Sequence, residues 1–380
     1  MVQKVLFITS SDVSGESGHN LATKEMLKAF SQSKNFQTSL IAPAPANNLS
    51  ERITRSIFSY RKLSVGDDWS IFDHISTQVQ LSRLVLQTIR EEQPDLIVCR
   101  VSHLMIIPPI YSTISSIPYV CLARGLSHRR GRFSTITTAV FGLNVRLADE
   151  VICAYDKIKQ EADTYRNSKQ PECVVFPNAV DPELFAPEDQ EVAKSKISIG
   201  DDSVPTIGFV GSFKDRHQID LLLRALSGFD KEVRCLLVGN GPQYGEIKQL
   251  ISELGMSDNV LLPGFVSHEE VSTYISACDI MYGVADPEQV SNPIKCYEYL
   301  ACERPVLTSK TPELQFIEEE GLGVAVTELT EQSVRDGVER LLSKSEDERR
   351  RMGERGRTYV IENHTWDQLP KRVLELINTD

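Results

Sequence analysis

A loop of mixed polar residues in the second half of the chain has the composition of an anion-binding site. In GFVGSFKDRHQID, Gly211 and Ser212 end an apolar run, and Lys214, Arg216 and His217 follow directly before a helical pattern. Three potential cations at the end of a strand and beside a helix N-terminus suit a diphosphate. A solvated polar loop is the alternative interpretation.

Two other glycine loops follow apolar runs. In SSDVSGESGHN, Gly15 and Gly18 stand just before a helix, where backbone N–H groups can approach a phosphate. A flexible loop explains these glycines equally well. In LLVGNGPQYGEI, Gly239 would let the backbone approach a base or ribose, or would serve a tight helix start.

The segment SNPIKCYEYLACERPVLTS places two charged residues on one helical face. It opens with Asn292, and Lys295 and Glu298 follow at i, i+3 spacing. A carboxylate in this position can accept hydrogen bonds from both ribose hydroxyls of a nucleotide. An ordinary Lys–Glu pair on the protein surface is the alternative.

Two arginine-rich segments lie in the first half of the chain. RITRSIFSYRKL mixes cations with apolar residues, and RGLSHRRGR concentrates four arginines between residues 124 and 132. Such clusters suit anionic lipid head groups or a phosphate on an acceptor. A solvated helix face is an equal alternative for residues 52–62, whereas the mutual repulsion of the second cluster favours a function.

Composition restricts the class of protein. The length of 380 residues suggests two domains, and 41 basic against 53 acidic residues disfavour a general nucleic-acid binder. The eight cysteines occur singly, which predicts neither zinc nor disulfides but free thiols in a reducing compartment. Without a signal sequence or an apolar stretch of membrane-spanning length, we expect a cytoplasmic protein, and consider a peripheral position on the inner membrane face as well.

The elements that must position these residues form two successive α/β series. Strand patterns alternate with helical patterns in each series, and a Pro- and Asp-rich linker at 177–189 separates them. We expect strands at 4–9, 38–42, 95–100, 118–122, 150–154, 173–176, 206–211, 233–239, 259–261, 279–282, 305–308 and 323–326. We expect helices at 20–32, 218–228, 242–254, 268–277, 293–302, 311–319, 330–343, 346–363 and 366–378.

This alternation predicts an α/β protein of two Rossmann-like, doubly wound parallel-sheet domains that face each other across a cleft. The predicted domains are residues 1–185 and 186–365, with a nucleotide-like ligand expected at the carboxyl ends of the strands. We expect the C-terminal helix, 366–380, to pack back on the first domain.

Five motifs in order resemble the retaining glycosyltransferases of the GT-B fold, family 4. They are the linker VVFPNAVDPELFAPE, VGSF with its following helix, LLVGNGP, NVLLPGFVSHEEVSTYISACDI and NPIKCYEYLACERPVL. The similarity covers nearly the whole chain. It implies transfer of a hexose or N-acetylhexosamine from a nucleotide-diphosphate sugar to a saccharide or lipid-linked acceptor, with retention.

The resemblance also assigns roles to individual residues. Glu298 matches the family glutamate that binds the donor ribose, and Lys295 lies near the nucleotide. Ser212 and His217 stand where many members have an Arg and a Lys that hold the diphosphate, so Lys214, Arg216 or Lys295 would supply that charge.

The predicted catalytic residues are the least regular part of the resemblance. Val290 replaces a family glutamate, which leaves Glu288 or Asp286 to meet the sugar hydroxyls. Arg124 replaces a first-domain histidine, and His128 follows it. We therefore predict Arg124, His128 and Glu288 as catalytic residues.

The resemblance leaves the reaction itself open at two points. The sequence has no DxD motif at a strand end, so we expect no metal and no cofactor. In the family, the leaving phosphate is commonly invoked as the base. The alternatives are a nucleotide-sugar 2-epimerase of similar architecture and a catalytically silent sugar-nucleotide binding protein.

Overall fold

The chain divides into two compact units. A computed structural model describes residues 2–11, 13, 18–43, 55–65, 71–101, 105–125, 134–199, 204–289 and 292–377. The first unit comprises residues 1–177 and 366–380, and the second comprises 178–365. The first boundary therefore precedes the predicted position at 185. The reason is that Val180 donates to the carbonyl of His364 at 2.9 Å and Arg357 donates to the carbonyl of Phe185 at 3.0 Å, both within the second unit.

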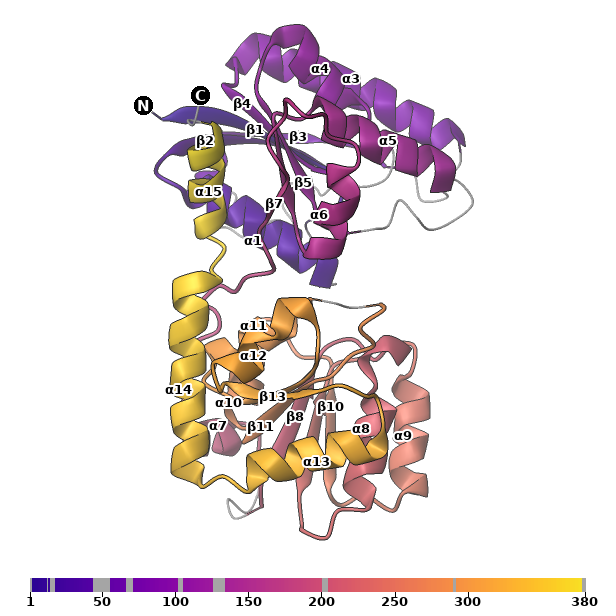
Figure 1. Ribbon diagram of the computed structural model, residues 1–380, viewed down its shortest axis with the longest axis vertical. Coiled ribbons are helices and arrows are strands. Elements are labelled where there is room, and N and C mark those ends of the chain that lie inside the picture. The colour runs from indigo at the N-terminus through magenta and orange to yellow at the C-terminus, as the bar shows by residue number, and fades with distance from the viewer. Residues whose placement is uncertain are drawn as a thin grey trace. The chain divides into compact units, whose positions relative to one another are not determined.

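A seven-stranded parallel sheet forms the centre of the first unit (Figure 1). Its strands, in the order β3-β2-β1-β4-β5-β6-β7, have the following bounds: β1 Gln3–Thr9, β2 Phe36–Ala42, β3 Ser59–Lys62, β4 Leu96–Val101, β5 Tyr119–Ala123, β6 Glu150–Cys153 and β7 Val174–Val175. Strands such as β1 and β5 read as continuous apolar runs because helices cover both faces of a parallel sheet.

Helices cover the sheet of the first unit on two sides. They are α1 Gly18–Gln32, α3 Ile71–Glu92, α4 Ile107–Ser115, α5 Ser134–Leu147, α6 Asp156–Asp163 and α15 Gln368–Ile377. In Figure 1, α3, α4 and α5 form one layer, whereas α15 contacts α1 on the other. The C-terminal helix thus belongs to the first unit.

Strand β3 and helix α3 have no counterpart among the elements read from the sequence. Strand β3 is a polar edge strand without a buried run, so it carries no alternating pattern. Helix α3 buries Leu81 and Val85 but exposes Ile75 and Val79. Because its apolar residues lie on more than one face, its sequence lacks a clear single stripe.

The second unit repeats the architecture with a six-stranded parallel sheet (Figure 1). Its strands, in the order β10-β9-β8-β11-β12-β13, have the following bounds: β8 Thr206–Val210, β9 Arg234–Val238, β10 Val260–Gly264, β11 Ile280–Gly283, β12 Val306–Ser309 and β13 Gly323–Val326. All six correspond to strands predicted from the sequence, and the prediction of two doubly wound parallel sheets is confirmed.

Seven of the eight helices that the structure describes in the second unit correspond to predicted helices, whereas the first, Gln190–Lys196, has no predicted counterpart. The eight are α7 Gln190–Lys196, α8 Ile219–Ser227, α9 Tyr244–Glu253, α10 Val271–Ser276, α11 Ile294–Ala301, α12 Phe316–Glu319, α13 Glu331–Leu342 and α14 Glu346–Asn363, with short 3-10 turns η3 Asp215–His217 and η4 Pro312–Leu314. Local signals set some boundaries. Helix α14 begins with a capping box, in which Ser345 and Glu348 satisfy each other's backbone N–H groups.

Each sheet has one point at which the chain reverses its direction of growth. In the first unit this switch lies between β1 and β4, and in the second between β8 and β11. Open parallel sheets bind ligands outside the carboxyl ends of the strands at such a point. The fold therefore directs the search for a site to the loops after β1, β4, β8 and β11.

Candidate functional site

The switch point of the second unit brings together three segments singled out in the sequence. The loop 211–217 follows β8, the loop after β11 begins at residue 284, and α11 comes next. The backbone N–H of Asp286 donates to the carbonyl of Arg216 at 2.8 Å, which joins the two loops. The hydroxyl of Tyr299 on α11 accepts from the N–H of Val210 at 2.9 Å and donates to its carbonyl at 3.1 Å.

Lys295 occupies the centre of this arrangement. Its residue is 8% exposed, and its Nζ lies 3.8 Å from the centroid of the Phe209 ring. A Cβ added to Gly211 would lie 2.8 Å from this Nζ, so only a glycine there leaves room for it. The described residues offer the Nζ no hydrogen-bond partner. Burial lowers the pKa of Lys295 to about 7; the charge of Glu298 opposes this shift, and that of Arg216 adds to it.

His217 and Arg216 lie beside this lysine. The His217 ring is 6.0 Å from the Phe209 ring, and within the described part of the chain its Nδ1 has no hydrogen-bond partner. The same holds for the buried Nε of Arg216. Burial, followed by the charges of Lys295, Arg216 and Lys214, lowers the pKa of His217 to about 2. In the empty site His217 is thus a neutral imidazole, and its role as a third cation towards a diphosphate stays a prediction.

Glu298 lies on the same helix as Lys295, and both residues are 8% exposed. This burial excludes the interpretation of the two as an ordinary surface pair. A carboxylate and an amine buried together at a sheet edge are costly without a ligand or other polar partners. Their burial supports a binding role for α11.

Gly239 and Gly241, in the loop after β9, allow close contact with the loop after β8. Gly239 has φ +132°, and a Cβ on it would lie 1.9 Å from the carbonyl oxygen of Gly211. A Cβ on Gly241 would lie 2.4 Å from the carbonyl oxygen of Phe213. The loop after β9 therefore packs backbone to backbone against the loop after β8. Contact of Gly239 with a ligand stays a prediction.

Asn292 and Ser212 border the same edge. Asn292 is 8% exposed, and its carbonyl accepts from Nδ2 of Asn178 at 2.8 Å. Ser212 is half-buried beside Gly211. Sequence reasoning missed Asn178, Phe209 and Tyr299 as supports of the site, although PNAVD, TIGFVG and KCYEYLA were all recognised as motifs.

Asp286 and Glu288, the carboxylates predicted to contact sugar hydroxyls, lie in the turn after β11. Asp286 accepts from the N–H of Glu288 at 3.0 Å and from Nε2 of Gln289 at 2.8 Å, so it stabilises its own turn. Glu288 is exposed. Val290 lies outside the described residues. The catalytic role of Glu288 stays a prediction.

Arg124 of the first unit has a structural task. Its guanidinium donates to the carbonyls of Phe176 and, at 3.3 Å, Pro177, and lies 5.7 Å from the ring centroid of Trp366. These contacts hold the last residues of one segment of the first unit against the first residue of the other. Its catalytic assignment stays a prediction.

Of the other residues predicted in the first unit, the structure describes only Gly18. Gly18 begins α1, whereas Gly15 and His128 lie outside the described residues. Sequence reasoning missed Arg100 at the end of β4, which is 1% exposed and donates to the hydroxyl of Ser11. Burial, with the charge of Arg124, lowers the pKa of Arg100 to about 9.

The first arginine-rich segment, 52–62, is only partly available to a ligand. Arg61 donates to Glu91 at 2.7 Å and to Glu92 at 2.9 Å, so its charge is already paired. Residues 52–54 lie outside the described residues, and contact of the segment with an anionic surface stays a prediction. Of the second segment, 124–132, only Arg124 and Gly125 lie within the described residues.

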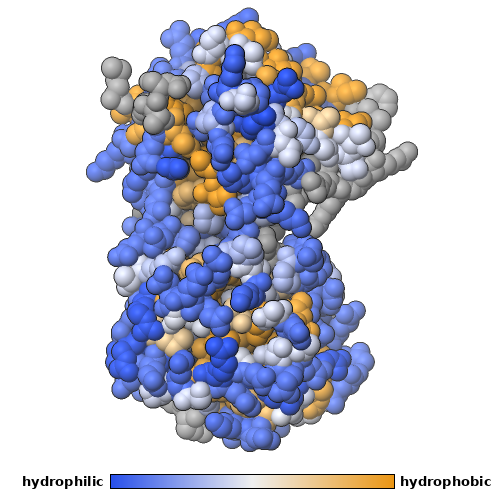
Figure 2. Space-filling model, viewed as in Figure 1, coloured by the Kyte–Doolittle hydropathy of each residue, from blue (hydrophilic) through white to orange (hydrophobic). Residues whose placement is uncertain are grey.

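The surface of the first unit also carries apolar side chains over α3 and α4, as Figure 2 shows. The exposed apolar residues on these helices are Ile75, Val79, Ile110 and Ile114. Among the described helices, none is long and apolar enough to cross a membrane.

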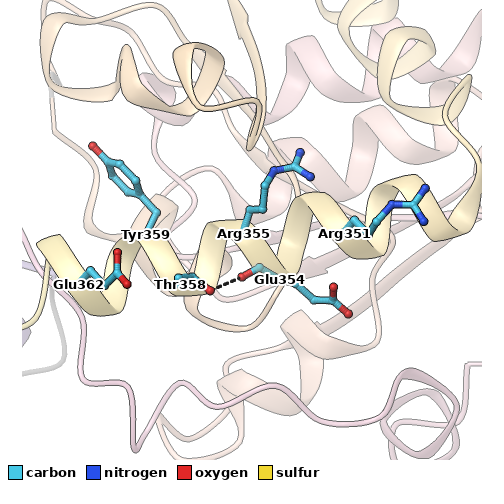
Figure 3. A pocket seen from close by; sticks show the side chains of 6 residues that line it. All are labelled: Arg351, Glu354, Arg355, Thr358, Tyr359 and Glu362. Atoms are coloured by element: carbon cyan, nitrogen blue, oxygen red, sulfur yellow. Dashed lines mark hydrogen bonds between the residues drawn. The ribbon is translucent and has the colours of Figure 1, made fainter.

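A hollow of about 440 Å³ lies along one face of α14 (Figure 3). Its lining is Arg351, Glu354, Arg355, Thr358, Tyr359 and Glu362. Two arginines and two glutamates balance its charge, and Arg355 donates to the carbonyl of Gly321 at 2.9 Å. The hollow shares no residue with the site at the switch point. Its side chains do not point toward a common centre in Figure 3.

All eight cysteines are buried free thiols, as predicted. The described residues contain no group of three or more His, Cys, Asp or Glu side chains that could hold a metal ion.

Residues 190–378 match the family model described as glycosyl transferases group 1. Among curated proteins, the chain is 29% identical over 113 residues to 2-deoxystreptamine glucosyltransferase of Streptomyces kanamyceticus, covering 28% of this chain and 29% of that protein. It is 26% identical over 188 residues to N-acetyl-alpha-D-glucosaminyl L-malate synthase of Bacillus anthracis, covering 49% and 48%. The matches thus span less than half of these two relatives.

Solved structures resemble the chain over its whole length. Sucrose-phosphate synthase of Thermosynechococcus elongatus has a TM-score of 0.76 at 18% identity and covers 100% of both chains. The Anabaena HepE protein in complex with UDP-glucose has a TM-score of 0.75 at 17% identity, again over 100% of both chains. The fold is that of GT-B glycosyltransferases, and over residues 190–378 the chain belongs to the glycosyl transferases group 1 family.

Proposed function

We propose that this protein transfers a sugar from a nucleotide-diphosphate sugar to a saccharide or lipid-linked acceptor, in glycoconjugate biosynthesis. The observation that carries the proposal is the buried Nζ of Lys295, which has no hydrogen-bond partner among the described residues and lies at the switch point beside Glu298. A buried amine without a hydrogen-bond partner lowers the stability of the empty protein when it is charged. A diphosphate offsets that loss.

The chemistry of the site suits departure of a diphosphate. Cleavage of the bond between sugar and phosphate places negative charge on the leaving group, and fixed cations stabilise that charge. Lys295, Arg216 and Lys214 supply the cations, and neutral His217 supplies a further hydrogen bond. We propose that these groups act without a metal ion.

Glu298 binds the ribose of the donor nucleotide. Its carboxylate accepts hydrogen bonds from the ribose hydroxyls, as the acidic residue of dinucleotide folds does. We further propose transfer of a hexose or N-acetylhexosamine with retention, in family 4, with the leaving phosphate as base. This finer assignment rests on the resemblance of the motifs and on the similarity to the glucosyltransferase and the N-acetylglucosaminyl L-malate synthase described above.

The test is incubation of the full chain with labelled nucleotide sugars and a panel of saccharide and lipid acceptors, with and without EDTA. We expect a labelled product that keeps the anomeric configuration, at equal rate in chelator. Isomerised donor would identify an epimerase, and binding without turnover would identify a silent binding protein. Loss of activity in EDTA that Mg²⁺ restores would refute the metal-free mechanism.

Glu298→Gln tests the contact of Glu298 with the ribose separately from the binding of the diphosphate by the cations. The variant should bind the donor about 1.5–3 kcal/mol more weakly, the scale of a hydrogen bond to a charged group. Exposed Glu339→Gln on α13 is the matched control. Calorimetry that finds an unchanged dissociation constant for Glu298→Gln would remove this assignment.

A further inference from the structure

Lys295 is a buried amine that faces groups of both signs. Arg216, Lys214 and the imidazole of His217 come from the loop after β8, and the face of the Phe209 ring, which favours a cation, lies 3.8 Å from the Nζ. Burial and the charge of Arg216 disfavour the ammonium. Glu298, one turn along the same helix, is the carboxylate that acts on it, and the neighbouring thiol is Cys296. With 8% of the residue exposed, water solvates the amine poorly.

We infer that binding of a nucleoside diphosphate brings a proton from solvent to Nζ of Lys295. The inference deepens the proposed function and rests on it. The amine lone pair takes a proton released by the buffer, and the resulting ammonium donates to the diphosphate oxygens. The empty site thus holds a neutral amine above neutral pH, and the occupied site holds an ammonium.

The direction of the linkage follows from the two charge states. In the empty protein the pKa of Lys295 is about 7, so the amine is mostly neutral at pH 8. A bound anion favours the charged form and raises this pKa towards or above the ordinary value of about 10.4. Proton uptake should therefore approach one at pH 8–9 and vanish below about pH 6, where the lysine is charged in both states.

Neither of the other titrating groups produces the same pattern. The imidazole of His217, with a pKa of about 2 in the empty protein, stays neutral at pH 8. A terminal phosphate loses its second proton near pH 6, so the free ligand is fully ionised at pH 8. Uptake at pH 8 therefore reports the amine.

The experiment is titration calorimetry of UDP, with methyl diphosphate, a monoester with one terminal phosphate, as a probe independent of the base. The buffers at pH 8.2 are Tris and HEPES, which differ in ionisation enthalpy, and the titration is repeated at pH 7.0. We expect uptake of about 0.9 proton at pH 8.2 and about 0.5 at pH 7.0, by the titration of a group with pKa near 7. The dissociation constant should rise towards tenfold per pH unit above pH 8.

Lys295→Arg assigns the proton, because a guanidinium stays charged at all these pH values. This variant should bind UDP with no uptake, whereas exposed Lys231→Arg should behave as the wild type. If Lys295→Arg does not bind, the wild-type pH dependence decides: a flat dissociation constant between pH 7 and pH 9 overturns the inference.

The failures are distinguishable. Binding of UDP or methyl diphosphate with equal enthalpy in both buffers overturns the proton linkage and leaves the proposed function intact. Uptake that persists in Lys295→Arg overturns the assignment to this lysine. A wild-type protein that binds neither probe overturns both the linkage and the proposed function.

Discussion

The two units share one architecture, but a cation at the sheet edge of each has different partners. In the first unit, half-buried Arg124 donates to two backbone carbonyls. At the sheet edge of the second, Lys295 Nζ and Arg216 Nε are buried without a hydrogen-bond partner among the described residues.

The difference separates structural cations from binding cations. A cation bonded to carbonyls stabilises the fold in the absence of any ligand, because its hydrogen bonds are already made. A buried cation without such bonds weakens the empty protein and gains most from an anion. Residue type alone does not distinguish the two cases.

The largest expected effect is on the loop contact that shapes the second site. Gly239→Ala places a Cβ at φ +132° and 1.9 Å from the carbonyl oxygen of Gly211. The unfolding free energy should fall by about 3 kcal/mol or more, since such a backbone conformation alone costs about 1–3 kcal/mol. Gly245→Ala, on helix α9 with no atom within 4 Å of its Cβ, is the control and should be neutral or slightly stabilising. Equal denaturation midpoints for both variants would contradict the loop contact.

Lys295→Met tests the binding cation directly. It should weaken UDP binding by roughly 10- to 150-fold, which corresponds to about 1.5–3 kcal/mol. The empty protein should be no less stable, because the variant removes a buried amine whose Nζ lacks a hydrogen-bond partner among the described residues. Calorimetry and thermal unfolding give the two readouts. A strong loss of stability with unchanged affinity would make Lys295 a structural cation like Arg124.

Arg124→Met should give the reverse result. Loss of the hydrogen bonds to the Phe176 and Pro177 carbonyls and of the contact with Trp366 should lower the unfolding free energy by about 1–2 kcal/mol. UDP affinity should stay within twofold of the wild type. Sugar transfer abolished at unchanged stability would instead support the catalytic role predicted from the sequence.

The smallest effect concerns acid stability of the second unit. His364 lies against the rings of Tyr297, Phe316 and Tyr359, and burial lowers its pKa to about 4. Between pH 6.5 and pH 4 the unfolded chain binds more protons at this residue, so stability falls as pH drops through this range.

His364→Phe should therefore flatten the pH dependence. Thermal unfolding at pH 7.5 and pH 5.0 should show a smaller loss of midpoint temperature on acidification for the variant than for the wild type. An unchanged difference between the two pH values would show that His364 does not titrate on unfolding.

The sequence by itself determined the architecture and the position of the candidate site in the second unit. Apolar runs such as LLVG and KVLFIT must be buried on both faces, and this requirement specifies strands of a parallel sheet. The motifs around Lys214 and Glu298 follow β8 and β11, so their chain order alone brings them to one switch point. Polar edge strand β3 escaped prediction because its residues bury no continuous face.

Only the tertiary structure decided what each charged side chain does. Burial turns His217 from a potential cation into a neutral imidazole, and ion pairs with Glu91 and Glu92 on α3 engage Arg61. Arg124 and Lys295 look equally available in the sequence, yet one meets carbonyls and the other an aromatic ring. The physical reason is that the pKa and the hydrogen bonds of a charged group depend on neighbours far away along the chain, which only folding brings within reach.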